Sequence, residues 1–240
     1  MTVPDHSRIR GLLFDRDGTL IDFHSAWTPA FLQAAEVVAD GNADLVRRLL
    51  EEAGFDIAAG RSKPGSLFAA ASDAELAAFW AGMIPGGDAQ DVLDAIKGIF
   101  AGQIEENARP VCDLVGFCDS MDSLGIVLGI ATNGSSPSSE AMMRRFGVHP
   151  RFAYYAGFDS GHEPKPHPSM GHGFCAATGL DPSEMAVVGD SRHDLEMARA
   201  AGAGLAIGVL TGTSGREDLE PYADLVLADI TGLVPLFEGR

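Results

Sequence analysis

A chain of 240 residues with 46% apolar content is long enough to bury a full hydrophobic core, as one large domain or two small ones. Its formal net charge of −17 at pH 7 would repel a nucleic-acid backbone or an anionic membrane surface, so we expect neither as a partner. Three widely spaced cysteines, no apolar signal segment at the N-terminus and no run of about 18 apolar residues favour a cytoplasmic protein without a disulfide framework.

Apolar segments that stop at polar or glycine-containing turns predict the strands of a sheet. These segments cover residues 8–14, 125–131, 152–157, 185–188, 204–210 and 223–227, the third being the weakest. Helical patterns cover residues 138–146, 168–178 and 194–201, and Gly202 is placed to cap the last. This alternation predicts an α/β fold with a Rossmann-like parallel sheet between two helical layers, a three-layer α/β/α core.

The stretch after the first strand has a different pattern. Helices are predicted at residues 29–39, 43–53, 73–83 and 89–104, with glycine- and proline-containing breaks at 60–66 and 84–88 and no clear strand. We therefore predict a helical domain at residues 22–109, inserted into a core domain made of residues 1–21 and 110–240.

Reactive polar side chains follow the predicted strands. They are Asp15 and Asp17 after the segment at 8–14, Thr132 and Asn133 after the segment at 125–131, Asp190 and Asp194 after the segment at 185–188, and Lys165 in the loop after the weakest strand. Ligands bind at the carboxyl ends of parallel strands, so these residues should line one crevice. Two carboxylates about 4 Å apart repel by roughly 4 kcal/mol at an effective dielectric constant of about 20, so the cluster calls for a cation. Oxygen ligands select Mg²⁺ or Ca²⁺ over zinc, and few carboxylates beside a phosphate pocket favour Mg²⁺.

The segments FDRDGTL, ATNG, EPKPHP and GDSRHD, in this order, resemble the motifs of the haloacid dehalogenase-like hydrolase superfamily, in particular its phosphoglycolate phosphatase-like branch. The helical insert lies where that branch carries its cap domain. The resemblance implies a magnesium-dependent phosphatase that acts on a small phosphorylated metabolite through an aspartyl-phosphate.

The resemblance also implies a role for each matching residue. Asp15 is the implied nucleophile and Asp17 the general acid and base, while Gly18 lets the backbone approach the phosphate. Phosphoryl oxygens would be bound by Thr132, Asn133 and Lys165.

The implied metal site involves Asp15, the main-chain carbonyl of Asp17, and Asp190. Asp194 would act through water or by holding Lys165. In the insert, Arg61 and Lys63 are candidates to bind a second anionic group of the substrate, or else belong to a solvated basic loop. Phosphoglycolate and sugar phosphates are candidate substrates, and we expect a monomer or a homodimer.

Other functions stay open at this point. A phosphosugar mutase of the same superfamily would return the phosphoryl group to a sugar, and a catalytically idle binding protein would not need Asp17 or Asp190. A dehalogenase is disfavoured because relatives with that activity lack the acid at the position of Asp17.

Several residues also have purely structural interpretations. An Asp-Gly turn, a helix cap and a helix-dipole charge account for Asp17, Thr132 and Asp194 respectively. The spacing of His162, His167 and His172 fits neither a helix face nor a strand face, which argues against a metal site. Arg16 stands where the family is often apolar, and we expect its side chain to point away from the phosphate with little effect.

Overall fold

The structure, a computed structural model, describes residues 6–238, so the outermost parts of the predicted core domain, 1–5 and 239–240, lie outside the described residues. The chain divides into two compact units. One, here called the core unit, combines the chain up to Asp22 with everything from Pro110 onward, and the other, the insert, runs from Phe23 to Arg109. None of the described helices has the length and apolar character needed to cross a membrane.

The core unit is built on a six-stranded sheet whose neighbouring strands are all parallel, in the order β5-β4-β1-β6-β7-β8. Its strands are β1 (Gly11–Phe14), β4 (Val127–Ala131), β5 (Phe152–Ala156), β6 (Met185–Gly189), β7 (Leu205–Val209) and β8 (Leu225–Leu227). Each predicted strand is present. The chain passes from β1 to β4 on one side and later to β6 on the other, so the strand order reverses beside β1, where such sheets bind ligands.

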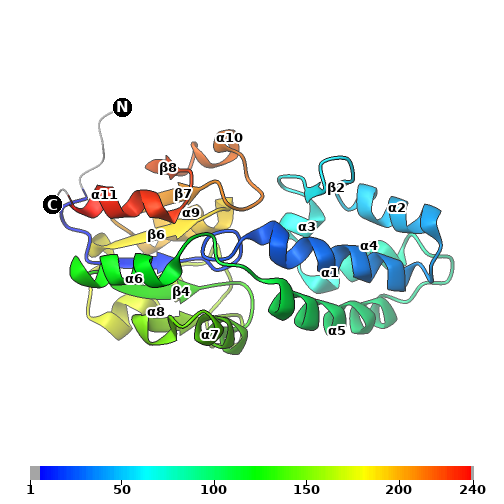
Figure 1. Cartoon of the computed structure of the whole chain (residues 1–240), viewed down its shortest axis with the longest axis horizontal. Helices are drawn as coiled ribbons and strands as arrows, with labels where there is room; N and C mark the ends of the chain where they lie inside the picture. Colours follow the sequence, from blue (N-terminus) through cyan, green and yellow to red (C-terminus); the bar gives the residue numbers. More distant parts are fainter. Residues whose placement is uncertain (1–5, 239–240) are drawn as a thin grey trace. The chain divides into compact units, whose positions relative to one another are not determined.

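Helices cover both faces of this sheet (Figure 1). They are α6 (Leu114–Ser123), α7 (Ser136–Arg145), α8 (Ser169–Thr178), α9 (Arg192–Ala201), α10 (Arg216–Leu219) and α11 (Leu233–Glu238). Successive residues of β1 face opposite layers. Phe14 meets Phe117 of α6 with ring centroids 5.9 Å apart, whereas Leu13 joins the buried cluster around Phe174 of α8. The predicted fold class is therefore confirmed.

The insert is mainly helical, as expected. It comprises α1 (Phe23–Val38), α2 (Ala43–Glu52), α3 (Leu67–Ala70), α4 (Asp73–Ala81), α5 (Ala89–Asn107) and the short strands β2 (Phe55–Asp56) and β3 (Arg61–Ser62). Its centre is aromatic: Trp27 stacks on Phe31 at 5.4 Å and meets Phe100 of α5 edge-on at 5.5 Å.

Two predictions for the insert were wrong. The first helix begins at Phe23 rather than at Pro29, which lies inside α1. Phe23, Trp27 and Phe31 recur every fourth residue and stack along one helix face, and this packing outweighs the hydrogen bond that proline removes. The insert also contains strands, since β2 and β3 pair antiparallel.

Phe174 of α8 packs directly against the backbone of the sheet. It is fully buried, and an added Cβ at Gly129 of β4 would lie only 2.6 Å from its ring. The sheet backbone and the ring are thus in direct contact, with no room for a side chain between them.

We expect Phe174→Ala to lower the free energy of unfolding by about 3–5 kcal/mol, because it leaves a cavity that the sheet backbone cannot fill. Phe158→Ala is the matched control, since Phe158 is 62% exposed and should change stability by less than about 0.5 kcal/mol. Urea unfolding followed by circular dichroism measures both, and equal effects would contradict this packing.

Candidate functional site

Four side chains from distant segments of the core unit meet in one buried cluster. Asp15 follows β1, Asp190 follows β6, Asp194 lies in the first turn of α9, and Lys165 lies in the loop after β5. Their exposures are 8%, 6%, 1% and 6% respectively. Ligand oxygens of the three aspartates lie within 4.8 Å of one another. The predicted gathering of acidic and basic groups at the strand ends is present.

Lys165 is the centre of this cluster, which we call the carboxylate cluster. Its Nζ donates to Asp15 Oδ1 at 2.5 Å, to Asp194 Oδ1 at 2.6 Å and to the main-chain oxygen of Ala131 at 3.0 Å. All three donors of the ammonium group are used. Burial alone would lower the pKa of Lys165, but the charges of Asp15 and Asp194 raise it well above its ordinary value, so the side chain stays charged.

The loop that carries Lys165 is fixed by Asn133. The main-chain N–H of Lys165 donates to Asn133 Oδ1 at 2.8 Å, and Asn133 Nδ2 donates back to the Lys165 oxygen at 3.3 Å. Asn133 thus holds the lysine loop with both ends of its amide. Thr132 is 2% exposed, and its hydroxyl accepts from Gly134 N at 3.0 Å; a hydroxyl that accepts one hydrogen bond can also donate one.

Asp194 is fully engaged within the protein. While Oδ1 accepts from Lys165, Oδ2 accepts from the main-chain N–H of Ser191 at 3.1 Å and from its hydroxyl at 2.6 Å. An added Cβ at Gly189 would lie 2.3 Å from Asp194 Cβ, so glycine is required there. These contacts favour holding Lys165, one of the two roles expected for Asp194, over binding a metal directly.

A glycine turn brings the segment after Asp17 against Asp190. Gly18 has a φ of +87°, and an added Cβ would lie 2.7 Å from the Asp190 carboxyl group and 2.8 Å from Gly212 Cα. Only glycine combines this backbone conformation with such a close approach.

The loop after β7 completes this side of the site, and the sequence prediction missed it. Thr211 Oγ1 donates to the Gly18 oxygen at 2.6 Å, and the main-chain N–H of Thr213 donates to Asp190 Oδ2 at 3.2 Å. A signal was available, because TGTSG follows a predicted strand whose carboxyl end lies at the same edge of the sheet.

The carboxylate cluster carries an excess of negative charge. Three ionised carboxylates against one ammonium leave two negative charges in a buried space. Burial first, and then the neighbouring Asp194 and Asp17, raise the pKa of Asp15 to about 7 despite Lys165. Burial, with Asp15 and Asp194, likewise raises the pKa of Asp190 well above its ordinary value. A site whose donors are all oxygen atoms and whose net charge is negative fits a hard divalent cation.

Arg16 does not behave as expected. We predicted that its side chain would point away with little effect, but it is 4% exposed and donates to Asp17 Oδ2 from Nε at 2.9 Å and from Nη2 at 2.5 Å. Burial alone would lower the pKa of Arg16, but the charge of Asp17 and these hydrogen bonds raise it. The Asp17 carboxylate is thus bound to arginine and is not one of the three grouped carboxylates.

The remaining candidates lie outside the carboxylate cluster. Arg61 and Lys63 are exposed residues at the β3 end of the insert's small hairpin. His162 forms a 3.0 Å hydrogen-bond contact with the Tyr154 hydroxyl, and His167 Nδ1 accepts from Ser169 N at 3.3 Å. Within residues 6–238 the grouped candidate metal ligands include no histidine.

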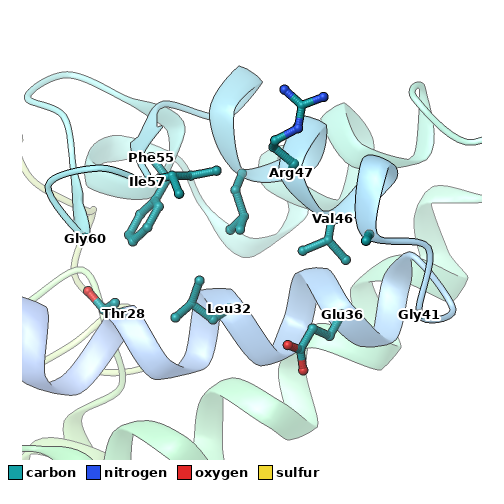
Figure 2. A pocket seen from close by; sticks show the side chains of 11 residues that line it. Thr28, Leu32, Glu36, Gly41, Val46, Arg47, Phe55, Ile57 and Gly60 are labelled. Atoms are coloured by element: carbon teal, nitrogen blue, oxygen red, sulfur yellow. The ribbon is translucent and has the colours of Figure 1, made fainter.

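The insert has a cavity of its own, of about 640 Å³. Figure 2 shows Leu32 of α1 on one side of it and Val46, Phe55 and Ile57 on the other. The lining is mainly apolar and includes none of the predicted site residues.

Comparison with known proteins identifies the family. The family model for haloacid dehalogenase-like hydrolases matches residues 9–202, a span that includes both the insert and the carboxylate cluster. The chain belongs to the haloacid dehalogenase-like hydrolase family. The resemblance inferred from the four motifs is therefore confirmed.

Individual relatives cover nearly the whole chain. The protein is 29% identical over 232 residues to the phosphoglycolate phosphatase of Pectobacterium atrosepticum, covering 95% of this chain and 92% of that one. It is 27% identical over 231 residues to the phosphoglycolate phosphatase of Yersinia pestis, with the same coverage. With the family match, these similarities support the assignment of the chain as a phosphatase.

The fold is also found among solved structures. A crystal structure of a predicted phosphoglycolate phosphatase from Haemophilus somnus superimposes with a TM-score of 0.74 at 20% identity, covering 95% of this chain and 98% of that one. At this identity the likeness concerns the fold.

The excess negative charge of the carboxylate cluster predicts how the stability of the protein depends on pH. The folded-state pKa of Asp15, about 7, lies above its ordinary 3.8, so without metal the folded protein holds a proton that the unfolded chain releases. The free energy of unfolding of metal-free protein should therefore fall as the pH rises through this window. Mg²⁺ should raise the thermal midpoint more at pH 8 than at pH 6, because at pH 6 it competes with the bound proton.

Thermal unfolding with EDTA and with Mg²⁺ measures this effect across the pH range. Asp15→Asn is the matched variant and should flatten the pH dependence of the metal-free protein. A Mg²⁺ effect that is equal at both pH values, or a variant that keeps the wild-type slope, would contradict the cluster's electrostatics.

Proposed function

We propose that this phosphatase transfers the phosphoryl group of a small phosphorylated metabolite first to Asp15 and then to water, in a site that binds Mg²⁺. The observation that carries the proposal is the arrangement of Asp15, which is buried at the end of β1 with one carboxylate oxygen bound to Lys165. A nucleophile needs a free oxygen held in a fixed direction, and this arrangement supports that role.

In the first step Asp15 attacks phosphorus, the bond from phosphorus to the substrate oxygen breaks, and Asp17 gives that oxygen a proton. In the second step water attacks the aspartyl-phosphate, Asp17 takes the proton from the water, and inorganic phosphate leaves with Asp15 restored. The position of Asp17, two residues after the nucleophile in the same glycine turn, supports one residue serving in both steps.

Charge on the transferred group would be balanced by the protein on several sides. Lys165 faces Asp15 directly, and the Thr132 hydroxyl, which accepts from Gly134 N, would donate to a phosphoryl oxygen. Asn133 acts in this proposal by fixing the Lys165 loop. Phosphate monoesters need accelerations up to about 10²¹, and general acid catalysis supplies only about 10²–10⁴ of this, so most must come from such positioned charge.

Asp15 and Asp190, with the main-chain carbonyl of Asp17, are the groups we propose to hold Mg²⁺, and Asp194 supports them through Lys165. When bound, the ion would supply positive charge to the phosphoryl oxygens and offset the two excess negative charges of the cluster. The raised pKa values of Asp15 and Asp190 in its absence support this assignment.

Phosphoglycolate is our first candidate substrate, because the relatives named above carry that activity in their names. Sugar phosphates are the alternative. We propose that the insert acts as the cap domain, with Arg61 and Lys63 as groups for the substrate's second anionic group, since both side chains are exposed cations. We place the protein in the cytoplasm, as its three free cysteines favour.

Asp15→Asn should reduce phosphate release from an aryl phosphate below detection, because the amide oxygen is a poor nucleophile and the charge facing Lys165 is lost. Asp119→Asn, a matched change on the exposed surface of α6, should keep wild-type turnover. Release of inorganic phosphate with Mg²⁺ and after EDTA treatment measures both. Activity that survives in Asp15→Asn, or that does not need a divalent ion, would refute the mechanism.

A panel of phosphorylated metabolites tests the substrate. We expect the highest kcat/KM for phosphoglycolate, and we expect Lys63→Met to raise KM for it more than for a phosphate with no second charge. A higher kcat/KM for a sugar phosphate would identify that sugar phosphate, instead of phosphoglycolate, as the substrate. Isomerised sugar phosphate without free phosphate would indicate a mutase instead.

A further inference from the structure

Arg16 stands between the proposed nucleophile and the proposed acid in the sequence, and among residues 6–238 it is the buried cation near the site that the proposed reaction does not use. Its guanidinium reaches two elements at once. Nε and Nη2 donate to Asp17 Oδ2 at 2.9 and 2.5 Å, and Nη1 lies 3.3 Å from the hydroxyls of both Ser138 and Ser139. With 4% of Arg16 exposed, solvent competes little with these contacts.

Both contacts to Asp17 fall on the same oxygen. Oδ2 accepts two donors, whereas Oδ1 is buried and accepts no hydrogen bond from the part of the chain that the structure describes. Arginine stays protonated and offers only donors, so the two contacts hold Oδ2 toward the guanidinium and restrict rotation of the Asp17 carboxyl group.

The two serines fix the other end of the guanidinium. Ser138 and Ser139 lie near the N-terminal end of α7, the helix that follows the Thr132–Gly134 segment. An added Cβ at Gly134 would lie 2.8 Å from Arg16 Nη2, so the guanidinium rests directly against that segment. Arg16 thus connects the loop of Asp17 with the loop of Thr132.

We infer that Arg16 is a positioning residue that binds Asp17 by Oδ2 and so fixes the orientation in which this side chain gives a proton to the leaving oxygen and later takes one from water. This rests on the proposed function, because it assigns a cause to the orientation of that reaction's acid. Arg16 itself gives up no proton and touches no reacting atom.

The leaving group offers a test that a merely structural role would not affect. A phosphate ester with an acidic aryl leaving group needs little protonation, whereas an alkyl phosphate needs the acid fully. In Arg16→Met, kcat/KM should fall by about 10²-fold or more for an alkyl phosphate and by less than about threefold for the most acidic aryl phosphate, within the range that general acids supply. The plot of log kcat/KM against leaving-group pKa should therefore steepen.

Three further variants complete the design. Arg16→Lys should recover part of the loss, because an ammonium can pair with Asp17 but cannot also span the two serines. A Ser138→Ala/Ser139→Ala double variant keeps the Arg16–Asp17 pair and should steepen the plot less, which provides a test even where Arg16→Met folds poorly. Arg144→Met removes an exposed arginine of the same helix and should leave the plot unchanged.

An equal fall for all leaving groups, with an unchanged slope in both Arg16→Met and the double serine variant, would reduce Arg16 to a structural role and overturn the inference. Faster turnover in Arg16→Met would overturn it as well, because the pair would then hold Asp17 out of use. If the wild-type protein releases phosphate from no member of the series, the proposed function fails instead.

Discussion

A buried excess of negative charge is the constraint around which the core unit is arranged. Oxygens of three aspartates lie within 4.8 Å of one another, and a single ammonium, that of Lys165, faces two of them. Such a cluster is costly for folding, because each buried carboxylate loses its hydration and repels the others. A hydrophobic cluster of the same volume would serve stability better. The arrangement is understandable as a site prepared for a cation and for a charged group in transfer.

The cluster is held in place by side chains that bind main-chain groups of other loops. Asn133 fixes the backbone of Lys165, and Thr211 fixes the oxygen of Gly18. Arg16 does the same between side chains, from the turn after β1 to α7. Because the loops start from the ends of neighbouring strands, small hydrogen-bonding residues are enough to fix their geometry. This accounts for a site that draws on segments far apart in the sequence and still holds its groups within hydrogen-bonding distance.

What the sequence could predict follows from this arrangement. Asp15 and Lys165 were found because buried strands are visible as apolar segments, and a parallel sheet gathers the residues at their ends. The start of α1 was missed because Pro29 normally marks a first turn, whereas stacking of Phe23 on Trp27 and the tertiary contact of Trp27 with Phe100 of α5 favour a helix that begins earlier. The direction of Arg16 was also missed. Alternation along an extended chain places neighbours on opposite sides, but a long side chain can fold back to a carboxylate one residue away.

If the phosphoryl group passes through Asp15, an aspartyl-phosphate forms on that residue during turnover and can be trapped chemically. Protein mixed with substrate and Mg²⁺ is quenched in acid during turnover, the acyl phosphate is reduced with borohydride, and the peptide that contains residue 15 is analysed by mass spectrometry. We expect the Asp15 side chain to be converted to the corresponding alcohol only when substrate is present. An active enzyme in which Asp15 stays unmodified while another side chain carries the phosphoryl group would contradict transfer through Asp15.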